Sequence, residues 1–288
     1  MNRIKYLIAV ILFITFSGCS LNKIVIGQME PILQKSSNAL YEESDLQLAE
    51  QALAGNLKLV EGLSKSDPQN DQLLLLLAQG YAGYALGFVE DVNAKRAVVF
   101  YKRAQEFALR ILRQDKSFAD AEKKGLDQLT GVINTYGKDK APALFWAGFA
   151  GAGYINLDLG NPESLIELPK VQAMMDRVEK VDPEFFYGAV YLYQGSVLGM
   201  KPVLMGGNPE KAKEYFDKNL ELNNQKFLLA YIYLAKYYAA KTLNEELYNQ
   251  CIRKVEAAPV NILPEMTLIN QIAKQKAKLL EKSKEDIF

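Results

Sequence analysis

The chain has 288 residues, of which 49% are hydrophobic, and this is enough to bury a sizeable core. Lysine plus arginine and aspartate plus glutamate both number 34, so no overall positive field favours nucleic acid. There is no histidine and there are only two cysteines, which excludes serine–histidine and cysteine–histidine catalysis and leaves a structural zinc site without ligands. We therefore predict a folded protein without enzymatic activity, cofactor or metal.

The N-terminal segment has the pattern of an export signal. Arg3 and Lys5 precede an uncharged run over residues 6–16, and small residues then lead to Cys19. The run is shorter than the roughly 20 residues needed to span a bilayer. A cysteine at the expected cleavage point resembles the lipobox of bacterial lipoproteins, in which the thiol is acylated; an ordinary secretory signal is the alternative. We predict a signal peptide over residues 1–18 and lipidation at Cys19.

The residues after the signal bear on the compartment. Ser20 follows Cys19, and in the lipoprotein sorting rule a residue other than aspartate at this place favours the outer membrane. We expect residues 19–43 to form the lipidated N-terminus and a linker, and residues 44–288 to form the folded domain. With Cys19 lipidated, Cys251 has no partner within the chain, so no disulfide framework is expected in spite of the oxidising compartment.

The rest of the chain has a helical pattern. Apolar residues recur three and four positions apart, and no stretch shows the sustained alternation of a β-strand. Residues 94–114 carry one apolar stripe, which predicts a helix buried on one face, whereas residues 71–90 are apolar nearly all round, which predicts a central helix. The fold class is therefore all-α. Turn motifs separate helices of roughly 12 to 22 residues, and they are SDPQN (66–70), GKDKAP (137–142), GNPE (160–163), VDPE (181–184), GGNPE (206–210) and AAP (257–259).

Two parts of the chain resemble each other at a constant offset of 115 residues. In each, a glycine is followed 17 residues later by an alanine, at Gly80 and Ala97 and again at Gly195 and Ala212. This spacing is longer than in the tetratricopeptide pattern, so we expect helix hairpins with lengthened connections and a close helix approach at both glycines. The pattern predicts a tetratricopeptide-like helical-hairpin solenoid closed into one compact domain. Chance similarity between two amphipathic hairpins is the alternative.

Two segments are unusual for a helical scaffold. Residues 141–157, APALFWAGFAGAGYINL, have no charge and contain the only tryptophan. Three glycines, a proline and the short length disfavour a membrane span, so the segment either lines an apolar ligand cavity or forms a core helix packed with aromatic residues. Residues 199–212, GMKPVLMGGNPEKA, form a turn whose apolar residues either fold onto the core or meet a ligand or partner.

The order of these segments resembles the T-component family of TRAP-associated lipoproteins (TatT), over about residues 44–288. The segments that carry the resemblance follow the lipobox at Cys19, and the block around LMGGNPEKAKEYF is the most specific of them. They are DPQNDQLLLLLAQGYAGYALGFVED, APALFWAGFAGAGYINL, LPKVQAMMDRVEKVDPEFFYGAVYLYQGSVLG, KPVLMGGNPEKAKEYFDKNLELN and INQIAKQKAKLL.

The resemblance implies a helical, tetratricopeptide-like periplasmic lipoprotein that can assemble as a homotrimer. It also implies association with a periplasmic substrate-binding P subunit of a TRAP-type transporter, and an apolar pore or pocket for hydrophobic ligands. The family has no catalytic residues to transfer, which agrees with the absence of histidine. From the local chemistry we predict that the ligand contacts are Phe145, Trp146, Phe149, Tyr154 and Met205.

The sequence thus favours a non-enzymatic accessory lipoprotein for solute uptake. We expect it to be held by lipid on the periplasmic face of the outer membrane, to bind the P subunit and to take up a hydrophobic small molecule. The alternative is a tetratricopeptide-type scaffold lipoprotein for envelope protein assembly, which would bind peptides along a concave groove and contain no cavity.

Overall fold

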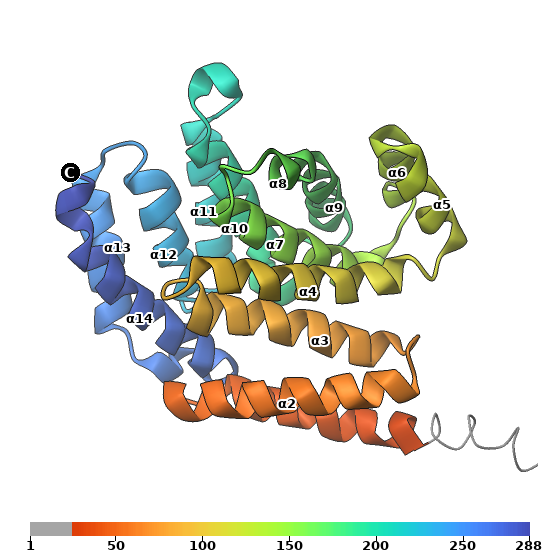
Figure 1. Ribbon diagram of the computed structural model, residues 1–288. Coiled ribbons are helices and arrows are strands. Elements are labelled where there is room, and N and C mark those ends of the chain that lie inside the picture. The colour runs from red at the N-terminus through yellow and green to blue at the C-terminus, as the bar shows by residue number, and fades with distance from the viewer. Residues whose placement is uncertain (1–24) are drawn as a thin grey trace, which may run out of the picture.

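A computed structural model describes residues 25–288, and all regular structure in this part of the chain is helical (Figure 1). The all-α class is therefore confirmed. The tetratricopeptide-like solenoid arrangement stays a prediction. The expected signal peptide (1–18) and the lipidation site at Cys19 lie outside the described residues.

The helix boundaries follow the turn motifs of the sequence, because all six predicted breakers fall at helix ends. Asparagine side chains accept a backbone N–H at several helix starts, as Asn70 does for Leu73 and Asn208 for Lys211, and this satisfies donors that have no partner inside the helix. After a first helix over residues 25–41, the α-helices are α2 (Leu46–Ser66), α3 (Asp71–Tyr84), α4 (Ala94–Leu112), α5 (Lys116–Lys124), α6 (Leu126–Ile133), α7 (Ala141–Leu157), α8 (Pro162–Ile166), α9 (Leu168–Val181), α10 (Phe185–Met200), α11 (Pro209–Leu222), α12 (Leu229–Leu234), α13 (Glu245–Ala257) and α14 (Thr267–Lys282).

The two segments related by the 115-residue offset each form a helix hairpin, α3 with α4 and α10 with α11. The glycines lie at close approaches, as predicted. A Cβ atom added at Gly80 would lie 2.8 Å from a methyl group of Leu57 in α2, and one added at Gly195 would lie 3.0 Å from the Phe216 ring in α11. The absence of a side chain at these positions sets the distance between the packed helices.

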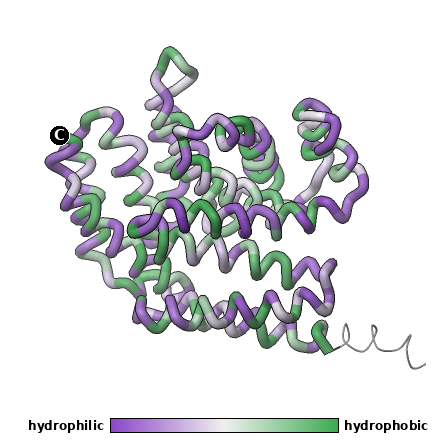
Figure 2. Tube along the Cα trace, in the orientation of Figure 1, coloured by the Kyte–Doolittle hydropathy of each residue, from purple (hydrophilic) through white to green (hydrophobic). Residues whose placement is uncertain are grey.

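Helix α7 lies in the centre of the molecule, against α3, α4, α9 and α10. The hydropathy colouring shows it as largely apolar or neutral along its length (Figure 2). Its three glycines receive neighbouring side chains rather than leaving space: Met175 lies at Gly148, Val171 at Gly151 and Tyr101 at Gly153. The uncharged segment is therefore a core helix.

Helix α3 continues into a short π-helical turn, η1 (Ala85–Val89), and a similar turn, η4 (Ala235–Ala239), continues α12. The stretch Asp71–Val89 is long and apolar enough to cross a membrane, but 61% of it is buried against other helices. Its apolar surface is thus covered by protein, as expected for the predicted central helix.

Residues 25–41, which we expected to belong to a linker, form a helix that packs against the domain. Ile26 is buried, and Leu33, Leu40 and Tyr41 pack against the core. Ile26, Leu33 and Leu40 are spaced seven residues apart and therefore lie on one face of a helix. Burial of this apolar face stabilises the helix. Two side-chain hydrogen bonds to α3 and its N-cap hold it, from Asn70 to Glu30 and from Gln79 to Tyr41.

The last helix, α14, returns to the start of the domain and contacts α2. The Lys276 ammonium is buried, and it donates to Glu90 Oε1 at 2.7 Å and to Asp91 Oδ2 at 2.6 Å. Burial alone would lower the pKa of Lys276, but the two carboxylates outweigh it and raise the pKa, so the charged form is kept. This ion cluster ties α14 to the end of η1.

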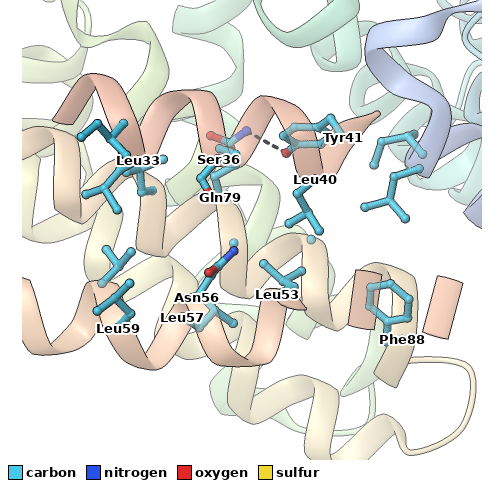
Figure 3. Close-up of a pocket in the computed structure, with 18 of the residues that line it drawn as sticks. Leu33, Ser36, Leu40, Tyr41, Leu53, Asn56, Leu57, Leu59, Gln79 and Phe88 are labelled. Carbon is cyan, nitrogen blue, oxygen red and sulfur yellow. Dashed lines mark hydrogen bonds between the residues drawn. The ribbon is translucent and has the colours of Figure 1, made fainter. Parts of the chain in front are cut away.

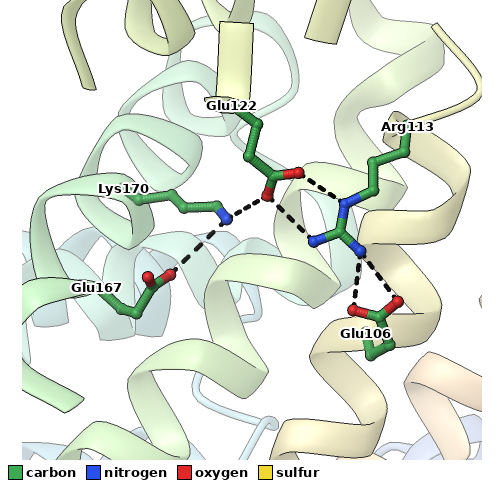
Figure 4. A network of polar contacts seen from close by, with 5 residues as sticks. All are labelled: Glu106, Arg113, Glu122, Glu167 and Lys170. Atoms are coloured by element: carbon green, nitrogen blue, oxygen red, sulfur yellow. Dashed lines mark hydrogen bonds and ion pairs between the residues drawn. The ribbon is translucent and has the colours of Figure 1, made fainter. Parts of the chain in front are cut away.

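A second polar network joins α4, α5 and α9 (Figure 4). Arg113 donates to both Glu106 and Glu122, and Lys170 contacts Glu122 at 2.6 Å and Glu167 at 3.7 Å. Burial would raise the pKa of the Glu122 carboxyl, but the hydrogen bonds from Arg113 and Lys170 outweigh burial and lower it to about 2. The folded protein therefore holds Glu122 ionised.

Replacing Gly195 with leucine should cost about 1 to 3 kcal/mol of unfolding free energy through overpacking against Phe216. Denaturant unfolding of Gly195→Leu measures this change. Gly62→Leu is the matched control, because Gly62 is exposed on α2 and a Cβ there meets nothing within 4 Å. Equal stability of the two variants would contradict the close crossing.

Glu122 should make the protein more sensitive to acid. Its pKa is lowered on folding from 4.5 to about 2, so its contribution is present above the ordinary value and is lost as pH falls toward 2. Thermal unfolding midpoints between about pH 7 and about pH 3 should fall less steeply for Glu122→Gln than for the wild type. Glu214→Gln, an exposed change on α11, should keep the wild-type slope; a parallel slope for Glu122→Gln would refute the role of the network.

Candidate functional site

An apolar pocket of about 250 Å³ lies between the first helix, α2, α3 and α14 (Figure 3). No lining side chain is charged. The first helix supplies Leu33 and Leu40, α2 supplies Leu53 and Leu57, and η1 supplies Phe88. The complete lining is Met29, Ile32, Leu33, Ser36, Ser37, Leu40, Tyr41, Leu53, Asn56, Leu57, Leu59, Val60, Leu76, Gln79, Gly80, Gly83, Phe88, Leu268, Ile269 and Ile272.

The helices make this pocket because their apolar faces do not fill the space between them. Two glycines of α3, Gly80 and Gly83, lie along one wall, and a Cβ atom at Gly83 would meet nothing within 4 Å. Ile32 and Leu59, with 66% and 53% of their surfaces exposed, also border the pocket. The opening to solvent is therefore apolar as well, which favours entry of an apolar molecule.

A few polar groups converge on the pocket. Gln79 Nε2 donates to the Tyr41 hydroxyl at 2.7 Å, and burial raises the pKa of Tyr41 to about 12, so this hydroxyl keeps its proton. Within residues 25–288 neither that proton nor the Asn56 amide has a hydrogen-bond partner (Figure 3). The pocket can therefore hold an apolar body and give hydrogen bonds to one neutral polar group of the ligand.

Three of the predicted ligand contacts form an aromatic cluster in the core. Phe145, Trp146 and Phe149 of α7 contact one another, with Phe145 and Trp146 ring centroids 5.0 Å apart. Phe185 and Phe186 of α10 complete the cluster, at 5.3 Å from Phe145 and 4.8 Å from Trp146 respectively. These three residues lie together but do not line the pocket between the first helix and α3.

The other two predicted contacts lie apart from this cluster. Tyr154 is buried near the end of α7, with the Lys102 ammonium 5.0 Å from its ring centroid. Met205 is exposed in the loop between α10 and α11, which projects from the body of the molecule (Figure 1). The apolar residues of this loop do not fold back onto the core. Neither residue lines the pocket, and ligand binding by the five residues stays a prediction.

The aromatic cluster depends on an unusual turn at the start of α10. Phe186, Tyr187 and Gly188 have positive φ angles of 46°, 58° and 64°, a left-handed conformation that is unfavourable for the two aromatic residues. Asn219 of α11 is fully buried and donates to the carbonyls of Tyr187 and Gly188, both at 2.8 Å. These two hydrogen bonds stabilise the turn that places Phe186 against Trp146.

Our sequence interpretation missed the pocket because it assigned one of its walls to a linker. The signal was nonetheless present: Ile26, Met29, Leu33 and Leu40 recur at helical spacing. The contribution of α14 depends on a contact between the two ends of the chain, and no local pattern reports such a contact.

Comparison with known families shows the family of the chain. The model of the TRAP transporter T-component family matches residues 42–288, which is most of the chain. The chain belongs to this family. T-components are accessory parts of TRAP transporters, so this chain has an accessory role in such a system and is associated with the cell envelope. A search of curated proteins found no match.

The left-handed turn of this T-component gives a test of how its aromatic cluster is held. Asn219→Leu removes the only side-chain donor to the buried Gly188 carbonyl within the described residues, and should cost about 1 to 3 kcal/mol of unfolding free energy. Because Trp146 is the only tryptophan and contacts Phe186, its fluorescence emission should shift too. Gln250→Leu, at an exposed amide on α13, should change neither property; an unchanged emission for Asn219→Leu would show that the turn is held by other contacts.

Proposed function

We propose that this T-component is a non-enzymatic periplasmic lipoprotein that takes up a hydrophobic small molecule and works with the substrate-binding P subunit of a TRAP-type system. The observation that carries the proposal is the pocket of about 250 Å³, whose lining is uncharged and mostly apolar. A binding site of this kind needs no catalytic group, in keeping with a sequence without histidine. Membership of the T-component family supplies the transport context.

The chemistry of the pocket narrows the class of ligand. An ionised group inside it would find no opposite charge, and burying an unpaired charge is costly. The ligand is therefore an apolar molecule with at most a neutral hydroxyl, ester or protonated acid near Tyr41 and Asn56. A charged headgroup remains outside, beyond Ile32 and Leu59.

The placement in the cell is also part of the proposal. The lipobox-like sequence at Cys19 supports a lipid anchor, and Ser20 supports the outer membrane. The homotrimer and the contact with the P subunit come from the resemblance to TatT proteins. The structure describes the first helix from residue 25, six positions after Cys19, so the proposed anchor and the pocket wall are close in the sequence.

Filling the pocket should weaken uptake of the ligand. Gly83→Leu points a side chain into the open space, so retention of an apolar molecule by the full chain should weaken by about tenfold, equivalent to ~1.4 kcal/mol. Native mass spectrometry in mild detergent, followed by solvent extraction, measures the bound molecule and the oligomeric state together.

Gly55→Leu is the matched control for this experiment, since Gly55 is exposed on α2 and has the same open surroundings. It gains the same helix propensity as Gly83→Leu and should retain the ligand. Wild-type protein that carries no apolar molecule, and that takes up none when supplied with fatty alcohols, would refute the binding function. Equal retention by the two variants would place the ligand elsewhere, such as beside Trp146.

A further inference from the structure

One exposed face of α4 carries arginine and phenylalanine residues in alternation. Their spacing of four, three, four and three positions places them in one stripe along the helix. We call this set the arginine stripe, and it consists of Arg96, Phe100, Arg103, Phe107 and Arg110.

Aromatic rings hold the arginine stripe in place. The Phe100 and Phe107 rings stack on Tyr81 of α3, with centroids 5.8 and 5.9 Å away. The Arg96 guanidinium carbon is 5.0 Å from the Phe100 centroid, and that of Arg103 is 5.8 Å from the same centroid. The rings form a rigid base that restricts the guanidinium groups, so little side-chain entropy remains to be lost when they bind a partner.

Within residues 25–288 the arginines of the stripe form no ion pair with a carboxylate, although Arg103 lies near enough to Glu61 to help lower the pKa of that carboxyl, and Arg110 donates to the Pro68 carbonyl at 2.7 Å. Arg96 and Arg103 take part in no ion pair among residues 25–288, whereas Arg113, one residue beyond the end of α4, is held by two carboxylates (Figure 4). Two carboxylates lie near the stripe, but both are engaged: Glu61 binds Lys58 and the Tyr81 hydroxyl, and Glu106 binds Arg113.

The stripe borders an open groove of about 640 Å³ between α2 and α4. Three cations and two carboxylates line it together with Phe107 and the exposed side chain of Val99, and these charged residues are Lys102, Arg103, Arg110, Glu61 and Glu106. A groove that combines aromatic and aliphatic side chains with arginines outside any ion pair has the composition of an interaction surface, in which arginine and aromatic residues are enriched. It is far too open for a small apolar ligand.

We propose that the arginine stripe is the docking surface for an acidic face of the P subunit. This inference rests on the proposed function, which supplies the partner, and adds where and by what chemistry the partner binds. Guanidinium groups pair with carboxylates through two parallel hydrogen bonds, so a partner with carboxylates spaced along a helix or strand edge matches Arg96 and Arg103. Since the chain as a whole has equal numbers of acidic and basic residues, the attraction is local to this face.

The arrangement also relates docking to the pocket. Helix α2 supplies Glu61 to the groove and Leu57 and Val60 to the apolar pocket. A partner on the arginine stripe thus contacts a helix whose other side forms the pocket wall.

The test is binding of the purified P subunit of the same transport system to the full chain in detergent, by calorimetry over a range of NaCl concentrations. Wild-type affinity should fall as salt rises, and Arg96→Glu with Arg103→Glu should weaken it by about tenfold or more. Lys123→Glu with Lys124→Glu, at exposed positions on α5, makes the same change in net charge and should leave the affinity unchanged.

A conservative variant and a crosslinking experiment separate loss of binding from misfolding. Arg96→Lys with Arg103→Lys keeps the charge and should retain most of the affinity, and a photo-crosslinking residue at position 99 should join the wild-type chain to the P subunit.

If the wild type binds and the glutamate variant binds equally well, the docking surface is elsewhere and only this inference fails. If the wild type does not bind the P subunit at all, the proposed partner fails and this inference fails with it. Crosslinking to lipid alone would identify the stripe as a membrane contact and overturn the inference.

Discussion

The buried Lys276 ammonium and its two carboxylates join the last α-helix, α14, to the end of η1. A buried lysine without a partner costs several kcal/mol, so Glu90 and Asp91 favour the position of α14 that keeps Lys276 beside them. The same helix brings Leu268, Ile269 and Ile272 to the pocket. The pocket therefore exists because the last helix returns to the first ones, and the ion cluster fixes the register of that return.

The apolar pocket and the arginine stripe depend on different physical interactions. The pocket relies on shape and on the hydrophobic effect, with no charge in its lining, whereas the arginine stripe relies on cations held over aromatic rings. No arginine of the stripe lines the pocket, so its charges stay outside the apolar lining. Helices α2 and α3 take part in both, because Leu57 and Gly80 line the pocket and Glu61 and Tyr81 support the groove.

Local features of the sequence were sufficient to predict the helix ends and the packing glycines. Proline and glycine motifs such as SDPQN act within a few residues, and Gly195 lies at a close crossing as its spacing suggested. The left-handed turn at Phe186 could not be predicted, since it is stabilised by Asn219, which is 33 positions away. The pocket was missed for the same reason: four separate parts of the chain form it, and only the periodicity of residues 26–40 gave a local sign.

The position of the first helix has a dynamic consequence. Few side chains of this helix are fully buried: in residues 25–41 only Ile26 is, whereas Leu33, Leu40 and Tyr41 are partly buried. Its detachment needs far less free energy than global unfolding, and hydrogen exchange would show this as a separate, low-energy opening unit. Ligand release would then follow the rate of this local opening, and the molecule would need no dedicated gate.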